Sequence, residues 1–157
     1  MWVYRKCILR RVTTQKTNPE EAAVIHVDAK IINRDKERGH RTFVAYCSED
    51  GTGFGFDEVK KDDANQTDAA ELYAIDFAVG SLRESKKRYV LLCDNESVVL
   101  MLRKGDPKFT VRTRPIMRKV WQELHKNSDF EIRNFPINQA DKLLNQKWRE
   151  LKNREPK

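Results

Sequence analysis

Cysteine is scarce in this 157-residue sequence. The only three cysteines are Cys7, Cys47 and Cys93, and no two of them have CxxC spacing. An odd count without metal-ligand spacing argues against a disulfide framework and against a zinc site. We therefore expect a protein of a reducing intracellular compartment, the cytoplasm.

Long hydrophobic runs are missing as well. No apolar stretch approaches the roughly 18 residues that a membrane span requires, and no apolar signal-peptide segment is present. The first 19 residues carry five basic residues and no acid, which is the charge bias of an organelle transit peptide, but they contain no serine. The sequence thus predicts neither membrane association nor organelle targeting.

Positive charge, in contrast, is in excess. The formal net charge of +7 and the pI near 9.4 favour a polyanionic partner such as nucleic acid. The segment from residue 103 to residue 119 contains seven basic residues and only one acid, Asp106. They are Arg103, Lys104, Lys108, Arg112, Arg114, Arg118 and Lys119. This segment is either a solvated helix face or a surface that contacts phosphates.

The length predicts one folded domain, residues 23–157, preceded by a basic arm, residues 1–22. Apolar and alternating runs predict strands at 24–32, 41–49, 52–59, 88–94 and 130–134. Helical periodicity predicts helices at about 68–82, 95–104, 115–124 and 138–153.

The order of these elements predicts an α/β fold. The first three strands are joined by short connections, with Asp50-Gly51 expected in a tight type I′ turn, and so form an antiparallel meander. The last two strands alternate with helices, and near-continuous apolar character in the fourth favours a parallel strand. We expect a mixed five-stranded sheet, three antiparallel strands then two parallel, flanked by helices.

Four acids stand at the ends of, or inside, apolar elements. Asp28 interrupts the first strand, where an ionised carboxylate must be paired or bound to a cation. Asp94 ends the fourth strand and Asp141 begins the last helix. Glu71 has two interpretations: with Asp68 it has capping-box spacing, or it is a rigid carboxylate that faces the strands. Our hypothesis is that the four acids converge in one folded site.

These segments, in this order, resemble type 1 ribonuclease H over about residues 23–150. VDAKIINRDKERGHRTFVAY is similar to the first hairpin of retroviral-type domains, AAELYAIDFAV to the AExxAL helix, LLCDNESVV to the strand followed by Asp-Ser, and NQADKLL to the final NExADxL. The resemblance implies the ribonuclease H-like fold. It also implies that two Mg²⁺ or Mn²⁺ ions are held by Asp28, Glu71, Asp94 and Asp141.

The implied reaction is endonucleolytic cleavage of the RNA strand of an RNA/DNA hybrid. The sequence implies no protein partner, and we expect a monomer by default. Contacts to RNA 2′-hydroxyls would come from Asn65, Gln66 and Thr67, with Asn65-Gln66 two residues earlier than the family places its pair. Phosphates would be positioned by the basic residues Lys104, Lys108, Arg112 and Arg114.

The sequence departs from the family pattern in two places. Ala29 follows Asp28 where the family has glycine, which alters close contact with the substrate. The segment before Asp141 has no histidine, so we expect slower cleavage without a histidine proton shuttle. His26 shares a strand face with Asp28, and we expect it to be a structural histidine.

Two other functions compete with this one. One is a non-catalytic module that binds hybrid or double-stranded nucleic acid, and the other is another nuclease or an integrase on the same fold. The presence of all four acids argues against a module that only binds, because repelling carboxylates oppose contact with a phosphate backbone. The AExxA helix favours the ribonuclease H branch.

Overall fold

The computed structural model describes residues 22–33, 39–104, 115–136 and 139–154. Nearly all of the predicted arm 1–22 and the predicted phosphate contacts Lys108, Arg112 and Arg114 lie outside these ranges. No helix within the ranges is long and apolar enough to cross a membrane. The strands are β1 (Ala23–Asn33), β2 (His40–Ser48), β3 (Phe54–Val59), β4 (Tyr89–Cys93) and β5 (Phe130–Asn134). The helices are α2 (Thr67–Leu82), α3 (Glu96–Arg103), α5 (Pro115–Lys126) and α6 (Gln139–Arg154), with short 3-10 helices η1 (Asp62–Asn65) and η2 (Arg83–Ser85).

The five strands form one sheet in the order β3-β2-β1-β4-β5. The pairs β1–β2 and β2–β3 are antiparallel, and the pairs β1–β4 and β4–β5 are parallel. This confirms the predicted meander followed by two parallel strands. Because β1 lies at the centre, it contacts both the meander and the α/β half of the chain.

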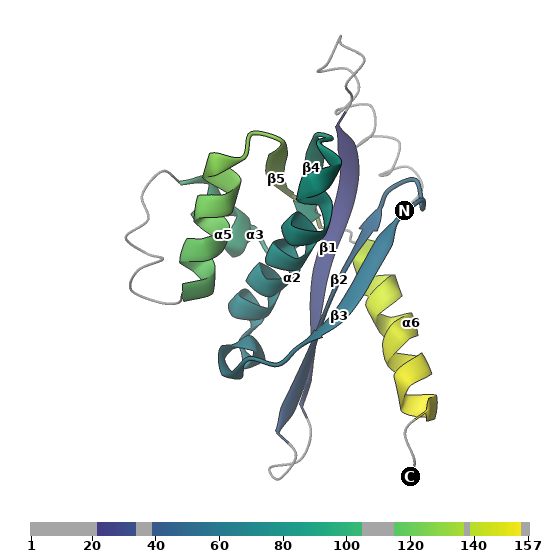
Figure 1. The fold of residues 1–157 in the computed structure, drawn as a ribbon. Coiled ribbons are helices and arrows are strands. Elements are labelled where there is room, and N and C mark those ends of the chain that lie inside the picture. The colour runs from purple at the N-terminus through teal and green to yellow at the C-terminus, as the bar shows by residue number, and fades with distance from the viewer. Residues whose placement is uncertain (1–21, 34–38, 105–114, 137–138, 155–157) are drawn as a thin grey trace.

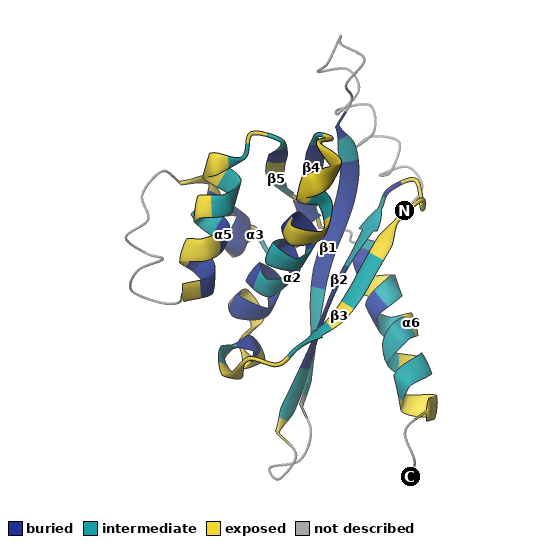
Figure 2. Ribbon diagram, viewed as in Figure 1, coloured by how far each residue is buried: buried dark blue, intermediate teal, exposed yellow. Residues whose placement is uncertain are grey.

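The sheet separates two unequal helical layers (Figure 1). Helices α2, α3 and α5 lie on one face and α6 lies alone on the other. The larger core fills the first face, where Val27 and Leu91 of the sheet pack with Leu72, Val98 and Val120 of the three helices. Figure 2 shows most of β1 and parts of α2 as buried, and the cluster of residues between the sheet and the three helices is the main apolar core.

Helix α6 covers a smaller apolar cluster on the other face. Phe43 and Ala45 of β2 pack against Ala140 and Leu144 of α6, with Trp148 beside them. Successive residues of a strand point to opposite faces. The β1 residues that face α2 are therefore apolar, whereas the alternate positions His26, Asp28 and Lys30 carry polar groups.

The connection from β2 to β3 differs from the predicted type I′ turn. The Gly51 N–H donates to Ser48 O (3.0 Å) and the Ser48 N–H donates to Gly53 O (2.8 Å), so the loop is longer than two residues. Gly51 has a φ of +79°, but Asp50 is not among the described residues with positive φ. A type I′ turn requires positive φ at both central residues, so that prediction was wrong. The longer loop lets Glu49 turn inward, where it is 4% exposed.

Candidate active site

The position of Asp28 follows from the unequal lengths of β1 and β4. The parallel pairing of β1 with β4 runs from Ala23 to His26, while the antiparallel pairing with β2 continues and places Asp28 opposite Ala45. Asp28 therefore lies beyond the last residue of β1 that pairs with β4. That side of β1 is open there to side chains from other elements, and Asp28 is only 5% exposed.

Glu71 reaches this opening from α2. The helix begins at Thr67 with Gln66 as its N-cap, and no side chain caps it. Asp68 is thus already inside the helix, where its carboxylate accepts a hydrogen bond from Asn95 Nδ2 (3.0 Å). The capping-box interpretation of Glu71 was therefore wrong. Glu71 is instead 5% exposed and its side chain is hydrogen-bonded to Asp28.

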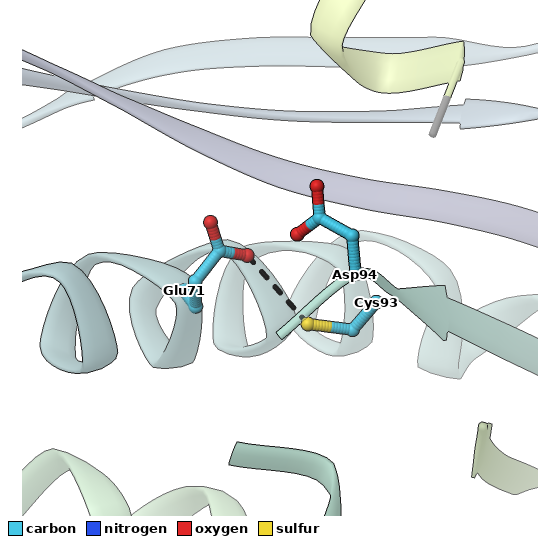
Figure 3. Close-up of side chains that lie close together, drawn as sticks. All are labelled: Glu71, Cys93 and Asp94. Atoms are coloured by element: carbon cyan, nitrogen blue, oxygen red, sulfur yellow. Dashed lines mark hydrogen bonds between the residues drawn. The ribbon is translucent and has the colours of Figure 1, made fainter. Parts of the chain in front are cut away.

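Asp94 joins the pair from the end of β4. It directly follows Cys93, and Asn95 then caps α3 by accepting a hydrogen bond from the Val98 N–H (3.1 Å). Ligand atoms of Glu71, Cys93 and Asp94 all lie within 4.8 Å of one another. Figure 3 shows the two carboxyl groups on the side of their backbones that faces β1, with the Cys93 thiol directed toward Glu71. The thiol donates to Glu71 Oε2 (3.6 Å).

Asp141 approaches from the opposite face of the sheet, in the first turn of α6. Its negative charge contributes to raising the pKa of both Asp28 and Asp94. Asp94 in turn raises the pKa of Glu71. The four acids predicted from the sequence therefore lie close enough to repel one another.

The buried pair Asp28 and Glu71 cannot ionise freely. Burial is the main cause of the raised pKa of Glu71, and the charge of Asp28 adds to it. Burial also raises the pKa of Asp28, to about 6, although its hydrogen bond with Glu71 opposes the shift. The raised pKa values therefore favour a proton on this pair, in the hydrogen bond between Glu71 and Asp28.

This donor set fits a hard divalent cation. Carboxylate oxygens are the ligands that Mg²⁺ and Mn²⁺ prefer, and crowded carboxylates are stabilised in their ionised form by a cation between them. Cys93 is also close, but burial and the charge of Glu71 raise the pKa of its thiol. A thiol must lose its proton to bind a metal, so the oxygens rather than the sulfur define the site.

Sequence reasoning missed two residues around the acids. Cys93 was treated only as an apolar strand residue, although its place next to Asp94 was the available signal. Glu49 was assigned to the end of a strand, but its Oε2 pairs with Nε2 of the buried His26. His26 is 2% exposed and has both ring nitrogens bonded, as expected of a structural histidine.

The predicted substrate contacts lie partly beside this site. Asn65 ends η1, and Gln66 and Thr67 precede Glu71 at the start of α2, with all three exposed. Lys104 is exposed directly after α3, where its carbonyl accepts a hydrogen bond from Trp121 Nε1 (2.8 Å). Both groups are thus accessible to a ligand, whereas Lys108, Arg112 and Arg114 lie outside the described ranges.

No protein-family model and no curated protein matches the sequence. Solved structures match it through their fold. A structure of the foamy viral protease-reverse transcriptase in complex with dsDNA has a TM-score of 0.59 and 15% identity, over 74% of this chain and 83% of that one. The same viral protein in complex with an RNA/DNA hybrid has a TM-score of 0.60 and 14% identity, over 83% of this chain but only 20% of that one.

A third solved structure also matches through its fold. LC11-RNase H1 in complex with an RNA/DNA hybrid matches with a TM-score of 0.53 and 12% identity, over 73% of this chain and 85% of that one. Together with the sheet order, these likenesses define an α/β protein with a mixed five-stranded sheet. The protein has the ribonuclease H-like fold.

Proposed function

We propose that this protein is a metal-dependent endoribonuclease that cleaves the RNA strand of RNA/DNA hybrids. The observation that carries the proposal is the clustering of Asp28, Glu71 and Asp94, whose pKa values are raised by burial and by one another's charge, with the charge of Asp141 close to them from the other face of a ribonuclease H-like sheet. Perturbed acids gathered in one place are a frequent mark of a functional site. Neighbouring folds solved with an RNA/DNA hybrid support the choice of substrate.

The four carboxylates would hold two Mg²⁺ or Mn²⁺ ions. When bound, the ions supply an activated water and stabilise the leaving 3′ oxygen of the phosphodiester. Asp28 and Glu71 are buried and therefore rigid ligands, and Glu71 must release its proton when a cation binds. Asp94 and Asp141 are exposed and would complete the site on its solvent-accessible side.

The protein's other contacts would orient the hybrid duplex. Asn65, Gln66 and Thr67 would contact 2′-hydroxyls in the minor groove, which distinguish RNA from DNA. Lys104, with Lys108, Arg112 and Arg114, would bind phosphates and fix the position of the duplex without reading its sequence. We propose that the protein acts as a monomer.

The test is cleavage of end-labelled RNA/DNA hybrid, RNA/RNA and DNA/DNA duplexes with Mg²⁺, Mn²⁺ or EDTA. Wild type is compared with Asp94→Asn and with a matched control, Glu96→Gln, which neutralises an exposed carboxylate two residues further along the chain. We expect metal-dependent cutting of the RNA strand of the hybrid, which Asp94→Asn loses and Glu96→Gln keeps.

Two other results would overturn the proposal in different ways. Tight binding of the hybrid without cutting in the presence of either metal would support the alternative function, a non-catalytic module that binds nucleic acid. Cutting of the DNA/DNA duplex in preference to the hybrid would point to another nuclease of the same fold.

A further inference from the structure

Two sets of polar contacts join β1 to the first turns of α6, one on each side of Asp141. The first set is centred on His26. The backbone N–H of Gln139 donates to His26 Nδ1 (3.2 Å), and His26 Nε2 pairs with Glu49 Oε2. Because a backbone N–H can only donate, Nδ1 is the acceptor and the proton lies on Nε2, directed at Glu49. The ring is thereby fixed in one tautomer and one orientation.

Glu49 extends this first set to the loop after β2. Its backbone N–H donates to Val24 O (2.8 Å), and its Oε1 accepts from Gln139 Nε2 (3.5 Å). Gln139 is therefore bonded twice, through its backbone to β1 and through its side chain to the loop. It is the first residue of α6 and stands two residues before Asp141.

The second set lies one turn further along α6. Lys30 Nζ donates to Asn145 Oδ1 (2.7 Å), and Asn145 Nδ2 donates to Asp141 Oδ2 (3.4 Å). The side-chain amide of Asn145 therefore links the positively charged Lys30 of β1 to the Asp141 carboxylate of α6.

The two sets share a simple geometry. His26, Asp28 and Lys30 alternate along β1 and so share one face of the strand. On α6, Gln139 is hydrogen-bonded to His26 and Asn145 to Lys30, and Asp141 stands between these two residues in the sequence. Asp28 and Asp141 carry like charges, and the flanking contacts hold the two elements that bear them together.

Stability alone does not account for a buried histidine and glutamate here. Apolar packing of Ala140, Leu144 and Trp148 already holds α6 against the sheet. Burying a carboxylate and its hydrogen-bonded histidine contributes little net stability compared with well-packed apolar groups, because desolvation offsets the attraction. What the polar contacts add is a fixed direction for the first turn of α6.

We propose that His26, Glu49, Lys30 and Asn145 are positioning residues that hold the Asp141 carboxylate in place to bind a divalent cation together with Asp28. The inference rests on the proposed function, because it concerns the same site. It adds four residues that touch neither the ion nor the substrate and act through Asp141.

The experiment measures Mn²⁺ binding by titration calorimetry, in the absence of any nucleic acid, on the full chain. Asn145→Ala removes the second set of contacts, and Gln146→Ala, the neighbouring amide on the exposed face of α6, is its matched control. The double variant His26→Leu/Glu49→Met replaces the first set by apolar groups and leaves no unpaired buried charge.

We expect Mn²⁺ affinity about 10-fold weaker in Asn145→Ala and in the double variant, within the range known for groups that orient metal ligands. Gln146→Ala keeps wild-type affinity. Thermal unfolding in EDTA shows separately whether each variant is folded. A folded double variant with weakened Mn²⁺ affinity is a result that a purely structural role does not produce.

Two results would overturn the inference, and they are distinguishable. Wild-type Mn²⁺ affinity in both variants would overturn this inference alone and leave the proposed function standing. A wild type that binds no Mn²⁺ would overturn the proposed function and, with it, the inference. If the double variant does not fold, Asn145→Ala decides the question.

Discussion

The four acids of the site form two halves with opposite environments. Asp28 and Glu71 are each 5% exposed, whereas Asp94 and Asp141 are exposed at the ends of their elements. The same functional group therefore has two different chemical characters within one site. Burial is the first cause of the raised pKa of Glu71, and Asp28 adds to it through its charge.

The difference separates two tasks. A buried carboxylate is held rigidly, but it must keep a proton or bind a cation, because an unpaired ionised group is costly in a low-dielectric interior. An exposed carboxylate is solvated and stays accessible to water and to an incoming ligand. Ionising Asp28 and Glu71 therefore costs free energy that a bound cation would offset. The exposed carboxylates Asp94 and Asp141 remain accessible to water and to a ligand.

The largest expected effect comes from Glu71→Gln, which should affect activity and stability in opposite directions. The glutamine amide donates to Asp28 as protonated Glu71 does, so folding no longer requires proton uptake. In EDTA at pH 8 we expect stabilisation of about 2 kcal/mol, falling toward zero near pH 5. Hybrid cleavage should fall about a thousandfold, the upper range for loss of one preorganised group.

The matching change in the exposed half is Asp141→Asn. It should also abolish most cleavage but leave stability in EDTA nearly unchanged, because this carboxylate is solvated. Chemical denaturation and cleavage rates measure both variants. Equal stability changes in the two variants would remove the distinction between the halves.

A smaller effect is the pH dependence of stability without metal. The pKa of Asp28 is raised from 3.8 to about 6 in the folded state, so its contribution to stability is full below about pH 4 and is lost as pH rises through 6. Glu71, raised in the same direction, extends the loss to higher pH. We expect a fall of about 3 kcal/mol from Asp28 between pH 4 and pH 8 in EDTA.

Saturating Mg²⁺ should suppress most of this fall, because the cation stabilises the ionised pair. Urea denaturation across the pH range, with Mg²⁺ and with EDTA, makes the measurement. The variant Asp28→Asn/Glu71→Gln is the control, and its free energy of unfolding in EDTA should depend much less on pH. An identical slope with and without Mg²⁺ in wild type would argue against cation binding by the buried half.

The smallest effect concerns a second carboxyl pair, outside the site. Burial and the charge of Asp76 raise the pKa of Glu123, and Glu123 Oε2 is a buried oxygen with no hydrogen-bond partner. Because solvent screens this partly exposed pair, we expect Glu123→Gln to stabilise the protein at pH 7 by only about 0.5 kcal/mol. The gain should be the same with Mg²⁺ and with EDTA. A gain that Mg²⁺ abolishes would indicate a second cation site.

Most of the fold could be predicted because local pattern and tertiary structure agree. The apolar run of β4 and the periodicity of α2 each specify one element, and the short connections of the meander specify its pairing. The prediction failed at the loop after β2. There Asp50-Gly51 favoured a tight turn, but a longer loop allows Glu49 to reach the buried His26.

The candidate site was predicted as a set of residue types and not as an arrangement. Asp28 was recognisable because a carboxylate inside an apolar strand is costly, and the other three acids because they stand at element ends. The same reasoning could not choose between two roles for Glu71. A capping box and a buried ligand have the same local spacing, and only the start of α2 at Thr67 separates them.

By itself, then, the sequence determined the order of strands and helices and the four carboxylates, because both depend on hydrophobic patterns read along the chain. Only the tertiary structure decided which acids are buried, which have a raised pKa, and which polar residues join α6 to β1. These properties depend on distances between residues far apart in sequence, such as His26 and Gln139. Electrostatic interactions and burial follow those distances and not the spacing along the chain.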